Sequence, residues 1–232
     1  MKHISTVILC LALLIGCQVP GVRDFWNTHS IDYSDIHAAE EQFADFAELA
    51  ASAPDEDALA ALDQLFDKLQ QDTLAYYVYS EWMDGAFYNL LSPCRSAALY
   101  GKAVDRFVAD GILSSDECEP FLRRREWIEY NLEGAKAIVP GLSAFDTRTM
   151  VLVLDLGCPS CREALERLSA DPQWDGLKKT AIGLGFGPKP EIPGWDYLFP
   201  ENGTSVFDIH MTPFYFVIAA DGTVERGYAL AL

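Results

Sequence analysis

A nearly continuous apolar segment, Met150 to Leu156, leads almost directly into the sequence Cys158-Pro159-Ser160-Cys161. An apolar run of this length is typical of a strand that is buried on both faces of a sheet. The residues that follow, from Pro159 to Leu168, place their apolar side chains at helical spacing. The pattern therefore predicts a buried strand that passes into a helix, with Cys158 at the helix start.

This position suits a reactive dithiol. Free backbone N–H groups and the positive end of the helix dipole stabilise a thiolate at a helix start. Such an environment lowers a cysteine pKa from about 8.5, in some motifs to about 3.5–7.5. Cys161 follows one turn later and is more shielded. We therefore expect Cys158 to attack a substrate disulfide and Cys161 to resolve the mixed disulfide, with Pro159 and Ser160 in the substrate-binding surface.

The first residues predict export. Residues 1–17 combine a cationic start with an apolar run from Ile4 to Ile15, too short to span a bilayer comfortably. Leu14-Ile15-Gly16-Cys17 resembles the bacterial lipobox, which implies cleavage before Cys17 and its lipidation. The alternative is an ordinary signal peptide that ends in a cysteine. The lipobox resemblance implies a lipid-anchored envelope protein, facing the periplasm or associated with the outer membrane.

Two other interpretations of Cys158 and Cys161 remain open. They could form half of a zinc site, but a second ligand pair is missing, because Cys94 and Cys118 are far apart and the histidines are scattered. They could also form an inert structural disulfide. In an exported protein, a dithiol at a strand-to-helix junction favours redox chemistry, so we expect no metal and no cofactor besides the Cys158–Cys161 disulfide.

The sequence that follows the dithiol helix predicts further strands of a mixed sheet. Thr180–Leu184 and Phe214–Ala219 are further β-like runs, and Asp221-Gly222 predicts a hairpin into Thr223–Leu230. The segment Gly185–Asn202 is rich in proline and aromatic residues and is expected to be a loop. The predicted fold is α/β, with the first strands joined by a helix.

Some fifty residues after the dithiol stands Thr212-Pro213, and with it the sequence resembles the thioredoxin superfamily, particularly envelope proteins of the TlpA/ResA type. The resemblance covers about residues 137–232. It implies that Pro213 is a cis-proline of the catalytic site and that the Thr212 backbone pairs with a substrate chain. A proline that merely begins a strand is the alternative.

The resemblance implies a thiol–disulfide oxidoreductase, more often a reductase, that acts on disulfide-containing envelope proteins with a redox partner protein. The second hypothesis is a binding or scaffold lipoprotein whose dithiol is vestigial.

Leu152 stands where many thioredoxins have a buried carboxylate, so Asp155, Glu163 or water would have to accept the Cys161 proton. Gly157 replaces a tryptophan and opens the rim of the site. His210 could tune Cys158, although a loop histidine is the simpler interpretation.

Residues 34–136 predict an all-helical domain, separated by a linker or a loosely docked arm (18–33) from the signal segment and followed by the thioredoxin-like domain (137–232). Ser114 and Glu117 form a capping-box pattern. We expect helices over 72–91, 93–109 and 115–132, and we expect the helical domain to cover part of the sheet. An aromatic group fits a helical core better than a ligand groove; it comprises Tyr76, Tyr77, Tyr79, Trp82, Phe87 and Tyr88.

Cys94 and Cys118 invite a disulfide, but the predicted helices place them at opposite ends of an antiparallel pair. Sixteen helical residues span about 24 Å, whereas a disulfide needs Cα atoms about 4.4–6.8 Å apart. The segment Ser92-Pro93-Cys94-Arg95 also resembles one found in the helical part of a group of bacterial lipoproteins.

The formal charge is −18, from 35 acidic and 17 basic residues. Such a surface repels phosphate backbones, so nucleic-acid binding is not expected. Membrane contact is expected through the lipid anchor alone.

Overall fold

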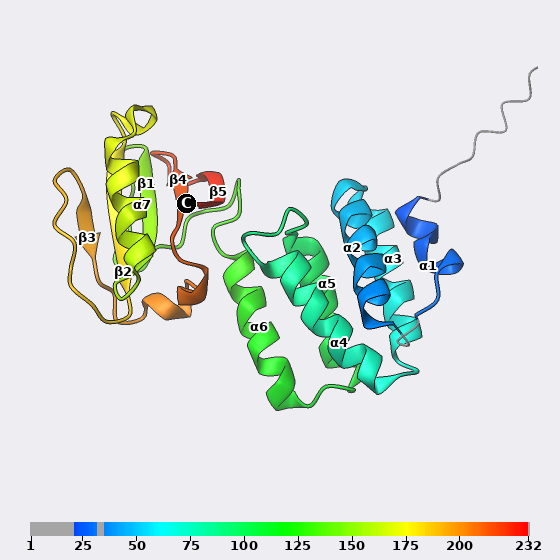
Figure 1. Ribbon diagram of the computed structural model, residues 1–232. Coiled ribbons are helices and arrows are strands. Elements are labelled where there is room, and N and C mark those ends of the chain that lie inside the picture. Colours follow the sequence, from blue (N-terminus) through cyan, green and yellow to red (C-terminus); the bar gives the residue numbers. More distant parts are fainter. Residues whose placement is uncertain (1–20, 32–34, 232) are drawn as a thin grey trace, which may run out of the picture.

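The computed structural model describes residues 21–31 and 35–231. A helical part is followed by a part built on a sheet, and of the helices in the helical part α6 lies nearest to the sheet in Figure 1. The predicted signal segment, including Cys17, lies outside the described residues. The helical part consists of η1 (Val22–Asp24), α1 (Phe25–Thr28), α2 (Ile36–Ser52), α3 (Asp55–Leu69), α4 (Thr73–Met83), the π-helical turn η2 (Asp84–Tyr88), α5 (Ala97–Asp110) and α6 (Ser115–Glu129).

Several of these helices begin where a side chain satisfies the free N–H groups of the first turn. The Asp72 carboxylate accepts from Leu74 and Ala75 at the start of α4. At the start of α6, Ser114 and Glu117 bond reciprocally, so the predicted capping box is confirmed.

Buried apolar and aromatic side chains fill one core in the helical part. Of the aromatic group, Tyr76, Tyr79 and Phe87 are fully buried, which agrees with a core rather than a ligand groove. Trp26 is also 0% exposed and packs 5.2 Å from the Phe46 ring. Residues 18–33 were expected to be a linker or a loosely docked arm; Val22–Thr28 forms short helical turns whose side chains pack firmly in this core.

Three of the predicted helices have different limits, and the one expected over 115–132 ends at Glu129. The helix expected over 72–91 ends at Met83 and continues as the turn η2. The helix expected from Pro93 begins at Ala97, because Ser96 caps it by accepting from Leu99. The connection between these two helices carries Tyr88 and Arg95.

The sheet has the strand order β3-β2-β1-β4-β5. β1, β2 and β3 are parallel, whereas β4 runs antiparallel to β1, and β5 antiparallel to β4. The predicted fold class, a helical part followed by a mixed sheet, is confirmed. The strands are β1 (Thr149–Asp155), β2 (Lys178–Leu184), β3 (Asp196–Leu198), β4 (Phe214–Ile218) and β5 (Val224–Leu230); α7 (Pro159–Ala170) joins β1 to β2, and the short turns are η3 (Pro172–Trp174), η4 (Gly203–Ser205) and η5 (Ile209–Met211).

β3 is the one strand that lies in a segment expected to be a loop, 185–202. It has three residues, and all of them are at least partly exposed at the sheet edge. An edge strand this short has no hydrophobic pattern from which it could be predicted.

Each face of the sheet is covered differently. α7 packs on one face, where Leu152 and Leu154 meet Ala164 and Leu165. The other face has a core around Phe207, Phe214 and Phe216, against which Leu90 and Tyr130 of the helical part also pack. The helical part thus covers some of the sheet, as expected. Within residues 21–31 and 35–231, none of the helices has both the length and the apolar character needed to cross a bilayer.

Candidate active site

The dithiol lies where β1 passes into α7. β1 ends at Asp155, whose Oδ1 accepts from the Gly157 N–H at 2.9 Å and whose carbonyl accepts from the Cys158 N–H at 3.1 Å. Cys158 is the N-cap of α7 with extended backbone (φ −95°, ψ 118°), and Pro159 opens the helix, a position that needs no N–H donor. The buried strand thereby delivers Cys158 to the positive end of a three-turn helix.

Cys158 is partly exposed, and its sulfur is surrounded by hydrogen-bond donors. The Ser160 Oγ lies 2.9 Å from the Cys158 Sγ. This hydroxyl, together with backbone N–H groups of the first helical turn, lowers the pKa of Cys158 below the ordinary value for a thiol. Each of these groups donates more strongly to a thiolate than to a thiol, which is why they favour the charged form.

Cys161 is in the opposite situation. It is 1% exposed and packs in the core beneath α7. Burial raises its pKa to about 11, although the nearby Thr212 side chain and the Asp155 backbone act in the other direction. Cys161 is therefore held protonated at neutral pH, while Cys158 is biased toward the thiolate.

The Thr212–Pro213 peptide bond is cis. The Thr212 hydroxyl, which lies near the Cys161 thiol, donates to the Ile209 carbonyl at 2.7 Å. The structure therefore brings together four of the residues singled out in the sequence, Cys158, Ser160, Cys161 and Thr212. They come from α7 and from the loop that enters β4.

The structure shows the surroundings of the residues that depart from the thioredoxin pattern and of the candidate proton acceptors for Cys161. Leu152 is fully buried in the same core as Cys161 and offers no polar atom there. Glu163 is exposed on α7, and the Asp155 carboxylate is engaged by Gly157. His210 is exposed, and the bonds found among the described residues join its backbone N–H to Asp208 at 2.9 Å rather than its ring to Cys158.

A surface beside the turn that precedes the dithiol was not predicted from the sequence. Phe186 is 98% exposed on the loop after β2, next to the turn that carries Gly157: a Cβ on Gly157 would lie 3.2 Å from the Phe186 carbonyl oxygen. The loop can approach so closely because Gly187 has no side chain; a Cβ there would lie 2.1 Å from the Leu156 oxygen. A hollow of about 570 Å³ opens along this loop, lined in part by Leu156, Phe186, Lys189 and Phe199.

The other two cysteines are separate from this site. Cys94 and Cys118 are both buried free thiols, and the Cys118 Sγ lies 3.6 Å from the Phe107 carbonyl oxygen. Burial raises the pKa of both. In the part of the chain that the structure describes, no group of histidine, cysteine and carboxylate side chains is arranged to hold a metal ion.

None of the known protein-family models matches this chain, and no curated protein sequence matches it. Its structure is similar to that of a thioredoxin-like protein from Bacteroides caccae, with a TM-score of 0.73 and 18% identity over 98% of this chain and 96% of the other. The C-terminal domain of an uncharacterized protein from Bacteroides fragilis covers 43% of this chain and 91% of its own, with 19% identity and a TM-score of 0.34. The first of these similarities shows that the chain has a thioredoxin-like fold.

Proposed function

We propose that this protein is a thiol–disulfide oxidoreductase in which Cys158 attacks and Cys161 resolves. The observation that carries the proposal is the contrast between the two sulfurs. One is partly exposed with a lowered pKa, and the other is buried with a pKa raised to about 11. An inert structural pair has no need of such a contrast, whereas a nucleophile and a resolving thiol require it.

The proposed reaction proceeds in two exchanges. The Cys158 thiolate attacks one sulfur of a substrate disulfide, that S–S bond breaks, and the departing substrate sulfur leaves as a thiolate that takes up a proton. Cys161 then loses its proton and attacks the Cys158 sulfur, which releases the second substrate thiol. Two electrons pass to the substrate, and the Cys158–Cys161 disulfide that remains requires a dithiol protein as reductant for the next turnover.

The surroundings of Cys158 support a polypeptide substrate. The Thr212 side chain lies against Cys161, and the Thr212 carbonyl, at the cis bond to Pro213, would pair with an extended chain, while Pro159 and Ser160 complete the rim. Phe186 and the hollow along its loop would receive an apolar side chain near the substrate cysteine. A protein disulfide would use both surfaces, whereas a small disulfide would touch neither fully.

The direction we propose is reduction, in the bacterial envelope, by a TlpA/ResA-like protein anchored through lipid on Cys17. The support is the resemblance of the sequence around Cys158 and Pro213 and the lipobox pattern at 14–17. Labelling with radioactive palmitate in a bacterial host tests the anchor, with Cys17→Ser as control. Equal labelling of both proteins would exclude lipidation of Cys17.

The test of the activity combines selective alkylation with turnover. We expect iodoacetamide at mildly acidic pH to label Cys158 first, as located by mass spectrometry, and Cys161 only slowly. We expect the protein to accelerate the reduction of insulin disulfides by dithiothreitol, Cys158→Ser to abolish this, and Cys161→Ser to accumulate a mixed disulfide. If both thiols label sluggishly and insulin reduction is not accelerated, the protein is a scaffold with a vestigial dithiol.

A further inference from the structure

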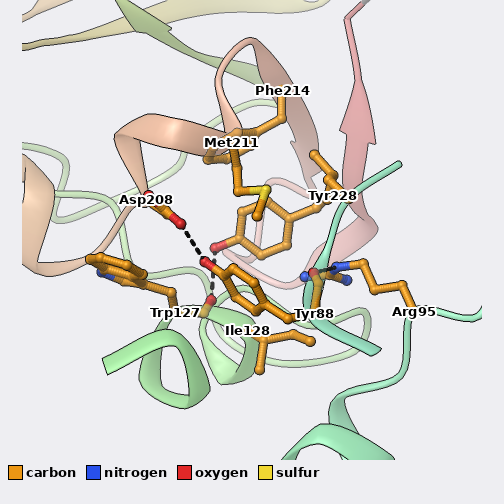
Figure 2. Close-up of a pocket in the computed structure, with 9 residues that line it drawn as sticks. Tyr88, Arg95, Trp127, Ile128, Asp208, Met211, Phe214 and Tyr228 are labelled. Atoms are coloured by element: carbon orange, nitrogen blue, oxygen red, sulfur yellow. Dashed lines mark hydrogen bonds between the residues drawn. The ribbon is translucent and has the colours of Figure 1, made fainter. Parts of the chain in front are cut away.

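A hydrogen bond joins the helical part to the loop that borders the dithiol. The Tyr88 hydroxyl, at the end of η2, donates to the Asp208 Oδ2 at 2.7 Å across a separation of 120 residues. Tyr88 is 3% exposed and Asp208 is 5% exposed. Figure 2 shows this bond at the centre of the contact, with the Tyr88 ring pointing from the helical part toward Asp208.

Asp208 organises the segment that leads to the active site. Its Oδ1 accepts from the His210 N–H at 2.9 Å, and its carbonyl accepts from the Met211 N–H at 3.2 Å, so it caps the turn η5. Thr212 follows directly, and its side chain contacts Cys161. The carboxylate that Tyr88 holds is thus four residues from a group that touches the resolving cysteine.

Tyr88 is itself held firmly on the helical side. The Arg95 Nε donates to the Tyr88 carbonyl at 3.2 Å, and the Tyr100 ring lies 5.2 Å from the Tyr88 ring. Burial and the Asp208 carboxylate raise the pKa of Tyr88, so its hydroxyl stays protonated and available as a donor. A buried donor to a carboxylate makes a strong, directional contact, and loss of either partner leaves the other unsatisfied.

Met211 packs against the core of the helical part, whereas two further polar contacts between the two parts reach other segments. Arg95 lies over the Tyr228 ring of β5, with 5.4 Å from its guanidinium carbon to the ring centroid, and the Trp127 Nε1 donates to the Thr204 carbonyl at 3.2 Å. These two contacts hold the helical part against the sheet part without touching the 208–212 segment. Among the hydrogen bonds found within residues 21–31 and 35–231, the one from Tyr88 reaches the segment 208–212 itself.

The cavity at this contact, lined by Tyr88, Arg95 and Asp208 among others, measures only about 20 Å³. That is room for about one water molecule and far below the size of a pocket for an organic ligand. The polar groups here therefore serve the contact between the two parts rather than a small molecule.

We propose that Tyr88 is a positioning residue for the redox site: through Asp208, the helical part holds the 208–213 loop against the dithiol in the arrangement that binds a polypeptide substrate. This inference rests on the proposed oxidoreductase function. It assigns the helical part a role in exchange with protein disulfides, beyond its own stability.

The test compares Tyr88→Phe with Tyr76→Phe. Tyr76 is an equally buried tyrosine whose hydroxyl donates to the Asp110 carboxylate at 3.1 Å, entirely within the helical part. We expect Tyr88→Phe to lower kcat/KM for insulin reduction about threefold to tenfold, mainly through KM, and to speed amide hydrogen exchange in a peptide covering 209–212. The rate with a small aromatic disulfide and the pH profile of Cys158 alkylation should not change. Tyr76→Phe should change none of these.

Asp208→Asn is the second variant, because it keeps an acceptor for Tyr88 and is expected to lose less activity than Tyr88→Phe. Wild-type kcat/KM and exchange in Tyr88→Phe would overturn the inference. So would a loss shared equally by Tyr76→Phe, or one accompanied by a shifted Cys158 profile, because either would mean a general loss of structure. A wild-type protein without insulin reductase activity would instead refute the proposed function; slow exchange at 209–212 that Tyr88→Phe accelerates would still show the positioning contact.

Discussion

Replacing Ser160 with alanine removes the hydroxyl that lies 2.9 Å from the Cys158 sulfur. A hydrogen bond to a charged group contributes about 1.5–3 kcal/mol when it is shielded from solvent. Cys158 is partly exposed and water competes for its thiolate, so we take about half of this range, roughly 0.7–1.4 kcal/mol. Since one pKa unit corresponds to about 1.36 kcal/mol, the pKa of Cys158 should rise by about half a unit to one unit.

The backbone N–H groups at the start of α7 are unchanged by this substitution, so the pKa should remain below that of an unstructured cysteine. The sign is fixed by the charge: loss of a donor to the thiolate disfavours the charged form and moves the pKa upward. Below both pKa values, the alkylation rate should therefore fall about threefold to tenfold. Well above them, the two proteins should react at nearly equal rates.

The assay is the pH dependence of iodoacetamide labelling of reduced protein, followed by mass spectrometry of the peptide that contains Cys158. A Cys161→Ala background removes the second thiol of the site from both proteins. Ser160→Thr retains a hydroxyl and should recover most of the wild-type profile. A Ser160→Ala profile that coincides with wild type, or that moves to lower pH, would refute the assignment of Ser160 as a thiolate donor.

Three further substitutions test other features of the structure. Phe186→Ala should leave the melting temperature unchanged, because the ring is 98% exposed; if a substrate covers about half of the ring, KM for insulin should rise about fivefold, and an unchanged KM would exclude that contact. Gly187→Ala should lower the free energy of unfolding in urea by about 1–3 kcal/mol, because a Cβ would lie 2.1 Å from the Leu156 oxygen. Gly85→Ala, where a Cβ would meet nothing within 4 Å, is its control and should cost much less. Trp26→Ala should cost about 3–5 kcal/mol by the same measurement, and a loss below about 1 kcal/mol would mean that the ring does not pack in the core.

The parts of the fold that could be predicted are those determined by residues close together in the sequence. The apolar run before Cys158 predicted β1, and the spacing after it predicted α7, because burial on two faces and on one face leave different periods in the sequence. The capping box at Ser114 likewise needs only residues three positions apart. β3 and the docking of Val22–Thr28 were missed, since each depends on a surface supplied by distant segments.

The same distinction applies within the site. The lowered pKa of Cys158 was expected from its place at a helix start, which is a local property, but the hydroxyl of Ser160 contributes as well and its orientation is not written in the sequence. The raised pKa of Cys161 depends on the core that forms over it, and the bond from Tyr88 depends on a partner 120 residues away. A dithiol motif therefore specifies which sulfur attacks, whereas the surface that we propose selects the substrate is assembled from loops and from the helical part. Two chains with the same four residues from Cys158 to Cys161 can share the chemistry and still differ in the disulfides they accept.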